Sequence, residues 1–354
     1  MKNKLFLLGI LLAVPAYAAP PNILFLFADD QRNHTLGCAG HPVVKTPHID
    51  RLAANGVRFK NAFVTTSTCW VSRACLFTSH YERSHRYRTA GRGTLDSDQC
   101  RSSYFAVLKR AGYRTGHMGK EHVSIAAEDA KAMWDVRRKL GRKPYFKKQP
   151  DGGKRHTTQI LGDWGLEFIR EQPFDVPFVL TISFNATHAE DGDKRPGIGH
   201  FPWPQVMDGK YENQKMPLPR LNDPAIFESQ PAFLKRSINR QRFFWRWDTP
   251  EKYQTNMRAY FRMLSGIDHV MGRLMKELDA RGMADNTIIV YSADNGYYLG
   301  DRGFAGKWTH YEESLRVPLI ISDPRVAKEQ KGVVRDELAL NIEIGSTLID
   351  LAGL

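Results

Sequence analysis

The amino-acid sequence predicts an α/β fold with a mixed, largely parallel central sheet and helices on both faces. Short apolar segments alternate with longer amphipathic segments along the chain, which is typical of strands joined by helical crossovers. The 354 residues are enough for one large domain of this kind. Apolar residues make up 42% of the chain, as expected when a sizeable core is buried.

Six segments have the apolar composition of buried strands, and four have the spacing of amphipathic helices. The longest helical segment, 251–281, repeats apolar residues from Tyr260 to Leu274 on one face, so we expect that face in the core. The expected strands are 22–28, 58–64, 113–118, 177–184, 287–292 and 317–322. The expected helices are 49–55, 103–111, 157–171 and 251–281, with a further helix near 342–351.

Residues 1–18 have the three parts of a secretory signal peptide. Lys2 and Lys4 give a positive start, residues 5–14 are apolar, and Ala16-Tyr17-Ala18 offers small residues for cleavage. The apolar part is shorter than the roughly 20 residues that span a bilayer. We therefore expect an exported protein, periplasmic or secreted, without a membrane span.

Residues 19–354 are expected to form one catalytic domain with an irregular insertion at about 186–250. The insertion is rich in proline, glycine, aspartate and aromatic residues and shows little periodicity. Ligands of α/β proteins lie at the carboxyl ends of strands, where a long loop can shape a substrate pocket. The alternative is a surface embellishment.

The net charge of +13 favours an anionic partner. Ten Lys and Arg residues lie in 131–155 against two acids, and five more accompany aromatic residues in 235–246. A sulfated glycan, a nucleic acid or an acidic surface would be attracted to such segments. A solvated basic face is the alternative for each segment, and export argues against nucleic acid.

Two acidic clusters directly follow predicted strands. Asp29-Asp30 follows 22–28, and Asp294-Asn295-Gly296 follows 287–292. Adjacent carboxylates at the end of a buried strand raise each other's pKa unless a cation neutralises them. A helix N-cap or a turn would explain either cluster alone. Together they favour one shared site for Ca²⁺ or Mg²⁺, which prefer oxygen ligands.

Cys69 opens the pattern Cys-x-x-Ser-Arg, which ends at Arg73. Residues 74–79 have the composition of a buried helix, and a helix N-terminus beside an arginine attracts anions. A cysteine in such a place is expected to have a lowered pKa, although a small buried thiol is the alternative. Export also allows a disulfide, for which Cys38 and Cys100 are one candidate pair.

The segment around Cys69 resembles the signature of the type I sulfatases of the alkaline phosphatase superfamily, in which the cysteine of Cys-x-Pro-Ser-Arg is oxidised to formylglycine. Further blocks are similar in the same order, from residue 22 to about residue 325. They are residues 22–30 (first strand and metal ligands), 46–56, 112–122 (a catalytic Lys and His), 177–188 (a substrate-contacting His), and 292–296 with 306–320 (second metal cluster and a sulfate-binding Lys).

The resemblance implies an alkaline phosphatase-like fold and hydrolysis of sulfate esters. The basic segments and the aromatic insertion suggest a sulfated carbohydrate as the substrate. The resemblance implies a bound metal ion, with Ca²⁺ favoured over Mg²⁺. It also implies a formylglycine-generating enzyme that converts Cys69 to formylglycine. One hydroxyl of the formylglycine hydrate would attack sulfur, and the other would later expel sulfate. The implied metal ligands are Asp29, Asp30, Cys69, Asp294 and Asn295. The implied catalytic residues are Cys69, Arg73 at the diol, Lys120, Lys307 and His188 at the sulfate, and His122 as the base that drives sulfate release.

Two features depart from the family pattern. Val71 stands where the signature usually has Pro or Ala, and the sequence ends at Leu354, so the smaller C-terminal subdomain of the family is expected to be missing. Two alternatives stay open: a phosphoester or phosphonate hydrolase of the same superfamily, and an inactive protein that binds sulfated glycans. His41, His48, His117 and His310 are assigned no role.

Overall fold

The computed structural model describes residues 19–87, 93–192, 195 and 199–354. The expected signal peptide, residues 1–18, lies outside the described residues. Within the described part of the chain, no helix combines the length and the apolar character that a membrane crossing requires.

An eight-stranded mixed sheet forms the centre of the protein, which confirms the predicted fold class. The strand order is β10-β2-β9-β8-β1-β7-β3-β4, and β9 runs antiparallel to its neighbours β2 and β8 while the other described pairs are parallel. Strands β5 and β6 form a separate antiparallel hairpin. The strands are β1 (Asn22–Ala28), β2 (Val57–Phe63), β3 (Arg114–Gly119), β4 (Val136–Lys139), β5 (Phe146–Lys148), β6 (Lys154–His156), β7 (Phe178–Ser183), β8 (Thr287–Ala293), β9 (Leu319–Ser322) and β10 (Val333–Leu340).

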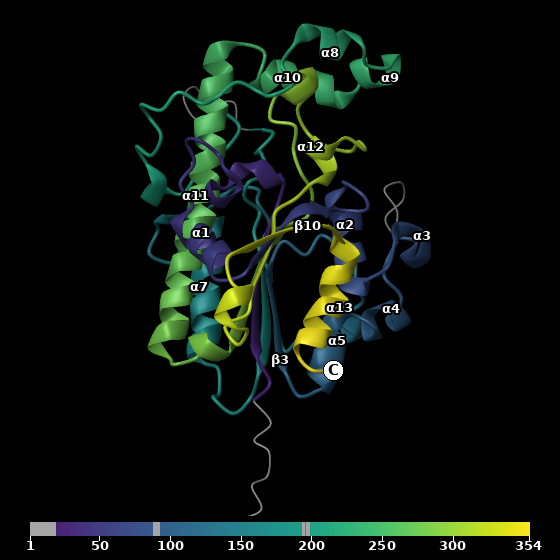
Figure 1. Ribbon diagram of the computed structural model, residues 1–354, viewed down its shortest axis with the longest axis vertical. Coiled ribbons are helices and arrows are strands. Elements are labelled where there is room, and N and C mark those ends of the chain that lie inside the picture. Colours follow the sequence, from purple (N-terminus) through teal and green to yellow (C-terminus); the bar gives the residue numbers. More distant parts are fainter. Residues whose placement is uncertain (1–18, 88–92, 193–194, 196–198) are drawn as a thin grey trace, which may run out of the picture.

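Helices cover both faces of the sheet (Figure 1). Helices α1, α7 and α11 pack together on one face, and α2, α5 and α13 pack together on the other. The helices are α1 (Pro47–Ala54), α2 (Cys69–Thr78), α3 (Glu82–His85), α4 (Ser97–Arg101), α5 (Tyr104–Arg110), α6 (Ala127–Met133), α7 (Thr157–Arg170), α8 (Pro224–Glu228), α9 (Ala232–Lys235), α10 (Ile238–Arg246), α11 (Pro250–Ala280), α12 (Glu312–Leu315) and α13 (Asn341–Leu351).

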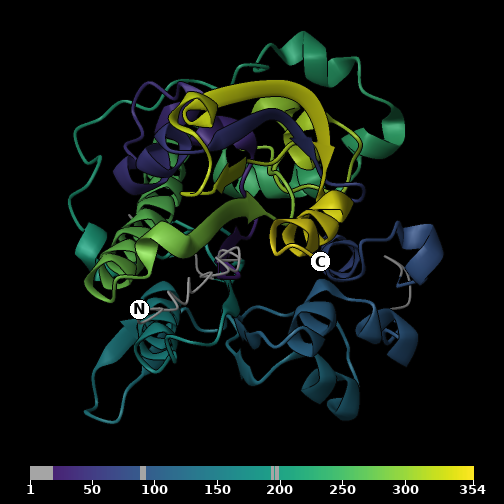
Figure 2. The ribbon, with the colours of Figure 1, turned by 60° about the horizontal axis from the view of Figure 1, so that its bottom comes forward.

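The six expected strands are present, and their ends differ from the prediction by at most two residues. No sequence pattern predicts β4 and β10, which are the two edges of the sheet. Most β10 side chains are exposed and β4 reads Val-Arg-Arg-Lys, so neither has an apolar run. Figure 2 shows early (purple) and late (yellow) segments side by side, in agreement with the pairing of β2 with β9 and β10.

The segment 186–250, predicted as irregular, contains three short helices in its second half. Helices α8, α9 and α10 lie beyond the carboxyl ends of the central strands, at the top of Figure 1. Two of them are only one turn long, too short to produce a detectable period. The candidate disulfide was wrong, because Cys38 and Cys100 are both free thiols.

His117 lies in the core between the sheet and the α2–α5 face. Its ring is 5.3 to 6.1 Å from the ring centres of Phe77, Phe105 and Trp134. Neither ring nitrogen has a hydrogen-bond partner among the described residues. Burial lowers the pKa of His117 to about 3, against the opposing effect of Glu121. The folded protein therefore holds this imidazole neutral, as a core side chain.

We expect His117→Leu to make the protein more resistant to acid. The unfolded chain binds a proton at its histidines near pH 6.5, whereas folded His117 binds one only near pH 3. Stability from this group is therefore complete above pH 6.5 and falls below it, by about 1.4 kcal/mol per pH unit. Urea unfolding at several pH values measures the slope. The exposed-histidine control His80→Gln should keep the wild-type slope, and an unchanged slope in His117→Leu would contradict the assignment.

Candidate active site

The two acidic clusters meet at the carboxyl edge of the sheet. Strands β1 and β8 are parallel neighbours in register, with Ala28 opposite Ala293, so the residues that follow them lie side by side. Ligand atoms of Asp29, Asp30, Asp294 and Cys69 all lie within 4.8 Å of one another, and all four residues are buried. The structure thus brings together carboxylates from opposite ends of the chain.

The backbone at Asp30 is held in an unusual conformation. Its φ is 59°, in the left-handed region that few non-glycine residues adopt. Its N–H donates to Asp294 Oδ1 at 3.2 Å, and its carbonyl accepts from Thr187 Oγ1 at 3.1 Å and from the Tyr260 hydroxyl at 3.0 Å. Strained residues persist where their surroundings fix them, as these three contacts do here.

Helix α2 supplies two residues of the site, Cys69 among the carboxylates and Arg73 as a cation that contacts one of them. Cys69 is the first residue of α2, and Arg73, one turn later, is fully buried. The Nε and Nη2 atoms of Arg73 are each 2.9 Å from Asp294 Oδ2. Nη1 donates to the Lys120 carbonyl at 2.6 Å and to Ser183 Oγ at 3.2 Å. Arg73 therefore ties α2 to the ends of three strands.

Two lysines complete the charge balance. Lys120 Nζ lies 2.5 Å from Asp29 Oδ2, and Lys307 Nζ contacts Asp30 Oδ1 and donates to Cys69 Sγ at 2.7 Å. Burial alone would raise the pKa of both Asp29 and Asp30. The Lys120 ammonium beside Asp29 and the Lys307 ammonium beside Asp30 outweigh burial and hold both pKa values below the usual range. Both carboxylates are therefore ionised.

The expected low pKa of Cys69 is wrong for the thiol in this structure. Burial raises the pKa of Cys69 to about 12, and the nearby ammonium groups of Lys120 and Lys307 do not offset it. The carboxylates of Asp294 and Asp29 add to the increase. The sequence showed the arginine and the helix start but not the depth at which Cys69 is buried.

The donor set fits a hard divalent cation. Asn295 Nδ2 donates to Asp30 Oδ1 at 2.7 Å, which turns its amide toward the cluster. Its Oδ1 atom is buried and accepts no hydrogen bond among the described residues. A buried acceptor without a partner is costly unless something else binds it. Together with the carboxylates of Asp29, Asp30 and Asp294, this oxygen matches the ligands of Ca²⁺ or Mg²⁺.

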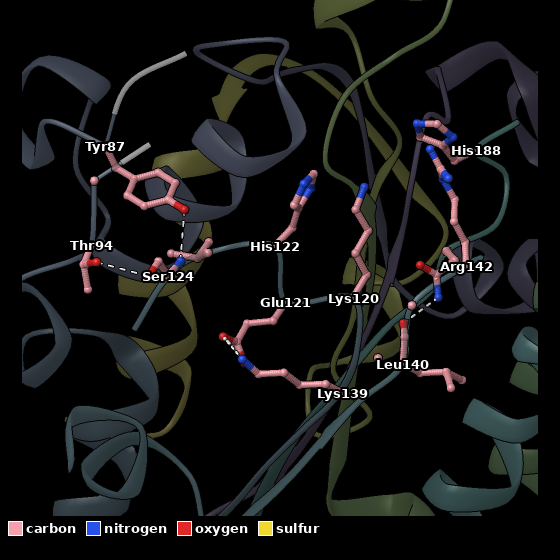
Figure 3. A pocket seen from close by; sticks show the side chains of 15 residues that line it. Tyr87, Thr94, Lys120, Glu121, His122, Ser124, Lys139, Leu140, Arg142 and His188 are labelled. Carbon is pink, nitrogen blue, oxygen red and sulfur yellow. Dashed lines mark hydrogen bonds and ion pairs between the residues drawn. The ribbon is translucent and has the colours of Figure 1, made fainter. Parts of the chain in front are cut away.

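A hollow of about 750 Å³ opens beside the cluster, and we call it the reaction hollow. Lys120, His122, Arg142 and His188 line it, and in Figure 3 the side chains of Lys120, His122 and Arg142 extend the same way, toward the level of His188. His188 Nε2 lies 3.6 Å from Asp30 Oδ2, and burial lowers the pKa of His188 to about 4. The ring centre of His122 lies 5.5 Å from that of Trp70.

Several side chains that support the site were missed from the sequence. Thr187 and Tyr260 hold the Asp30 carbonyl, Asn239 Nδ2 donates to the Lys307 carbonyl at 2.6 Å, and Arg142 lines the reaction hollow. Thr187 follows a predicted strand, as the other site residues do, and that was the one available signal. Tyr260 and Asn239 lie on helices whose spacing indicates only packing.

The comparisons with known proteins agree with this geometry. The family model described as Sulfatase matches residues 21–354. The chain belongs to the sulfatase family. By family it is a sulfuric ester hydrolase, and its sheet has the alkaline phosphatase-like arrangement.

Similar proteins include two bacterial sulfatases. An N-acetylglucosamine-6-O-sulfatase of Bacteroides thetaiotaomicron is 28% identical over 94% of this chain and 68% of its own length. An ulvan-active sulfatase of Formosa agariphila is 28% identical over 88% of this chain, which spans 58% of that relative.

Two solved structures share the fold. A structure described as a complex with its substrate D-glucosamine-2-N,6-O-disulfate has a TM-score of 0.76 and 25% identity, over 95% of this chain and 77% of that one. A phosphonate monoester hydrolase from Silicibacter pomeroyi has a TM-score of 0.72 and 22% identity, over 94% and 73%. The second likeness concerns the fold alone.

We expect Arg73→Met to lower the free energy of unfolding by about 3–5 kcal/mol, because it leaves the Asp294 carboxylate buried without its closest cation. The double variant Arg73→Met/Asp294→Leu should recover much of the loss, since no unpaired charge is then buried. Urea unfolding measures both. Arg138→Met, at the half-exposed pair with Glu167, is the control and should cost at most about 1 kcal/mol. Equal losses at Arg73 and Arg138 would refute a buried-charge role.

We expect Ca²⁺ to raise the thermal unfolding temperature of the wild-type protein relative to chelator. An ion that binds only the folded state stabilises it by about 2.7 kcal/mol at a hundredfold excess over its dissociation constant. Asn295→Leu removes the unpartnered Oδ1 oxygen and should reduce the Ca²⁺-dependent shift. Asp268→Asn alters a buried carboxylate that caps α1 outside the cluster, and should keep the full shift. An equal shift in both variants would place the ion elsewhere.

Proposed function

We propose that this protein hydrolyses sulfate esters of a sulfated carbohydrate, using a formylglycine formed from Cys69 and a bound Ca²⁺ ion. The observation that carries the proposal is the buried cluster in which Cys69 meets Asp29, Asp30 and Asp294, with Lys307 donating to its sulfur. A nucleophile that lies among carboxylates and cations suits the hydrolysis of an anionic ester. The cations can stabilise the negative charge of the ester away from water.

In this proposal Asp29, Asp30, Asp294 and Asn295 hold the ion. When bound, Ca²⁺ supplies Lewis-acid polarisation of an ester oxygen, and formylglycine supplies a hydrated aldehyde with one hydroxyl to attack sulfur and one to release sulfate. Arg73 contacts Asp294 and the Lys120 carbonyl. These contacts hold one metal-binding carboxylate and one residue of the reaction hollow in place.

The remaining site residues handle charge and protons. Lys120 and Lys307 lie within reach of the carboxylates and of residue 69, so they would face the sulfate oxygens as charge stabilisers. His188, beside Asp30, or Lys307 would give a proton to the leaving alkoxide. His122, across the reaction hollow, would take the proton that drives release of sulfate.

A sulfated sugar is the proposed substrate class because two relatives carry such names, an N-acetylglucosamine-6-O-sulfatase and an ulvan-active sulfatase. The basic lining of the reaction hollow suits an anionic sugar. We further propose that residues 1–18 direct export to the periplasm or beyond. A formylglycine-generating enzyme would act on Cys69, and a nucleic-acid partner is not part of the proposal.

Mass spectrometry of the tryptic peptide 61–73 tests the modification, because Cys69 is its one cysteine. After co-expression with a formylglycine-generating enzyme, we expect an aldehyde-bearing peptide and turnover of aryl sulfate. Turnover should be lost in Cys69→Ala, which keeps the fold but cannot be converted. Cys75→Ala, in the same helix and outside the cluster, should stay active.

Matched aryl sulfate and aryl phosphate esters separate the remaining alternatives. A preference for the sulfate supports the proposal, and a preference for the phosphate would reassign the site to phosphoester hydrolysis. An inactive binding protein would be indicated if Cys69 stays unmodified, no turnover is seen and sulfated glycan still binds. In that case Val71→Pro would be the first substitution to test.

A further inference from the structure

A second and larger hollow lies next to the reaction hollow. It measures about 1100 Å³ and is lined by the β5–β6 hairpin and by residues from the segment after β7, and we call it the hairpin hollow. The lining residues that matter here are Tyr145, Phe146, Lys148, Lys154, Glu190 and Trp203. None of them belongs to the carboxylate cluster or to the catalytic residues proposed above.

The two hollows share a wall. Tyr145 lines the hairpin hollow, and its hydroxyl donates to the carbonyls of Asn185 at 2.7 Å and of His188 at 2.5 Å. Both acceptor residues line the reaction hollow. Arg142 of the reaction hollow also faces Glu190 of the hairpin hollow, with 3.9 Å between Nη1 and Oε1. The two hollows are therefore neighbours, separated by Tyr145 and by the facing side chains of Arg142 and Glu190.

The β5–β6 hairpin places two positively charged side chains at this hollow. Lys148 and Lys154 are directly opposite each other in the β5–β6 register, both are exposed, and neither forms an ion pair within the described ranges. Like charges in directly opposed positions destabilise a hairpin. The opposite face of β5 and β6 carries Lys147 and Arg155, and Arg155 is neutralised by Asp163 at 2.5 Å. Lys147 also forms no ion pair among the described residues, but the two unpaired lysines that oppose each other directly, Lys148 and Lys154, lie on the face that lines the hollow.

Other basic residues of segment 131–155 are neutralised within the protein. Arg137 and Lys139 pair with Glu121, and Arg138 pairs with Glu167. The aromatic and basic segment 235–246 is likewise engaged in packing, since Arg246 contacts Asp191 and donates to the Tyr297 hydroxyl at 2.8 Å. Of the basic residues in segment 131–155, Lys143, Lys148 and Lys154 form no ion pair among the described residues, and all three line the hairpin hollow.

The hairpin hollow also has a fixed aromatic surface. Trp203 Nε1 donates to Asp208 at 2.7 Å, and the Arg262 guanidinium lies 4.6 Å from the ring centre, so the indole is held in place. A rigid indole offers a large contact area at little entropic cost. Ammonium groups beside an indole suit the anionic groups and the apolar face of a sugar unit.

We propose that the hairpin hollow binds a second anionic sugar unit of a sulfated oligosaccharide whose reacting sulfate lies in the reaction hollow. The proposal rests on the proposed function and extends it, because it makes the substrate an oligosaccharide rather than a single sugar. Lys148 and Lys154 bind the sulfate or carboxylate of the second unit, and Trp203 contacts its ring.

Calorimetric titration of the full-length Cys69→Ala protein, which cannot turn over substrate, tests this inference with a heparin tetrasaccharide and with glucosamine 6-sulfate. We expect the tetrasaccharide to bind at least about tenfold more tightly than the monosaccharide. Lys148→Gln/Lys154→Gln in this background should weaken tetrasaccharide binding about tenfold and change monosaccharide binding less than about twofold. Trp203→Ala should act in the same direction.

The control is Lys131→Gln/Lys147→Gln, which removes the same charge from α6 and from the opposite face of β5. It should leave tetrasaccharide binding within about twofold of the parent. Equal binding of both sugars, or an equal loss in the control, would overturn the inference. Aryl sulfate turnover of the Lys148→Gln/Lys154→Gln protein with Cys69 intact is measured separately. If turnover is kept and the binding result is negative, the inference fails while the proposed function stands.

Discussion

The neutralisation of three buried carboxylates is the constraint on which the site depends. Asp29, Asp30 and Asp294 are fully or almost fully buried, and carboxylates so close together repel strongly in a low dielectric. Three cations form ion pairs with them: Arg73 with Asp294, Lys120 with Asp29 and Lys307 with Asp30. Each cation comes from a different part of the chain, so this balance needs the sheet, α2 and the segment after β8 to be in place together.

The sheet makes that balance possible by simple geometry. Parallel strands end at the same edge, so β1 and β8 present their acidic residues as neighbours, and β3 and β7 bring Lys120 and Ser183 to the same edge. Helix α2 then needs only one turn to place Cys69 and Arg73 against both acidic clusters. Support from Thr187 and Tyr260 holds Asp30 in its left-handed backbone conformation.

The strands that are buried on both faces, and the polar residues that follow them, could be predicted from the sequence. Asp29, Lys120, His188 and Asp294 could be found because each follows an apolar run that predicts a strand. The edge strands β4 and β10 could not, since exposed strands need no apolar run. The raised pKa of Cys69 was also out of reach, because burial depends on how distant segments pack. The division of segment 131–155 into paired and unpaired cations required the hairpin register, which no local pattern specifies.

The adjacency of β1 and β8 has a consequence for the order of events as the chain folds. Residues that face each other across this pair, such as Ala28 and Ala293, come from nearly opposite ends of the described chain, and contacts at such separations are slow to form. Until β8 is in place, β1 ends in two acidic groups with no ordered counterpart from Asp294 or Lys307. The carboxylate cluster is therefore complete only once segments from the two ends of the described chain have come together in the sheet.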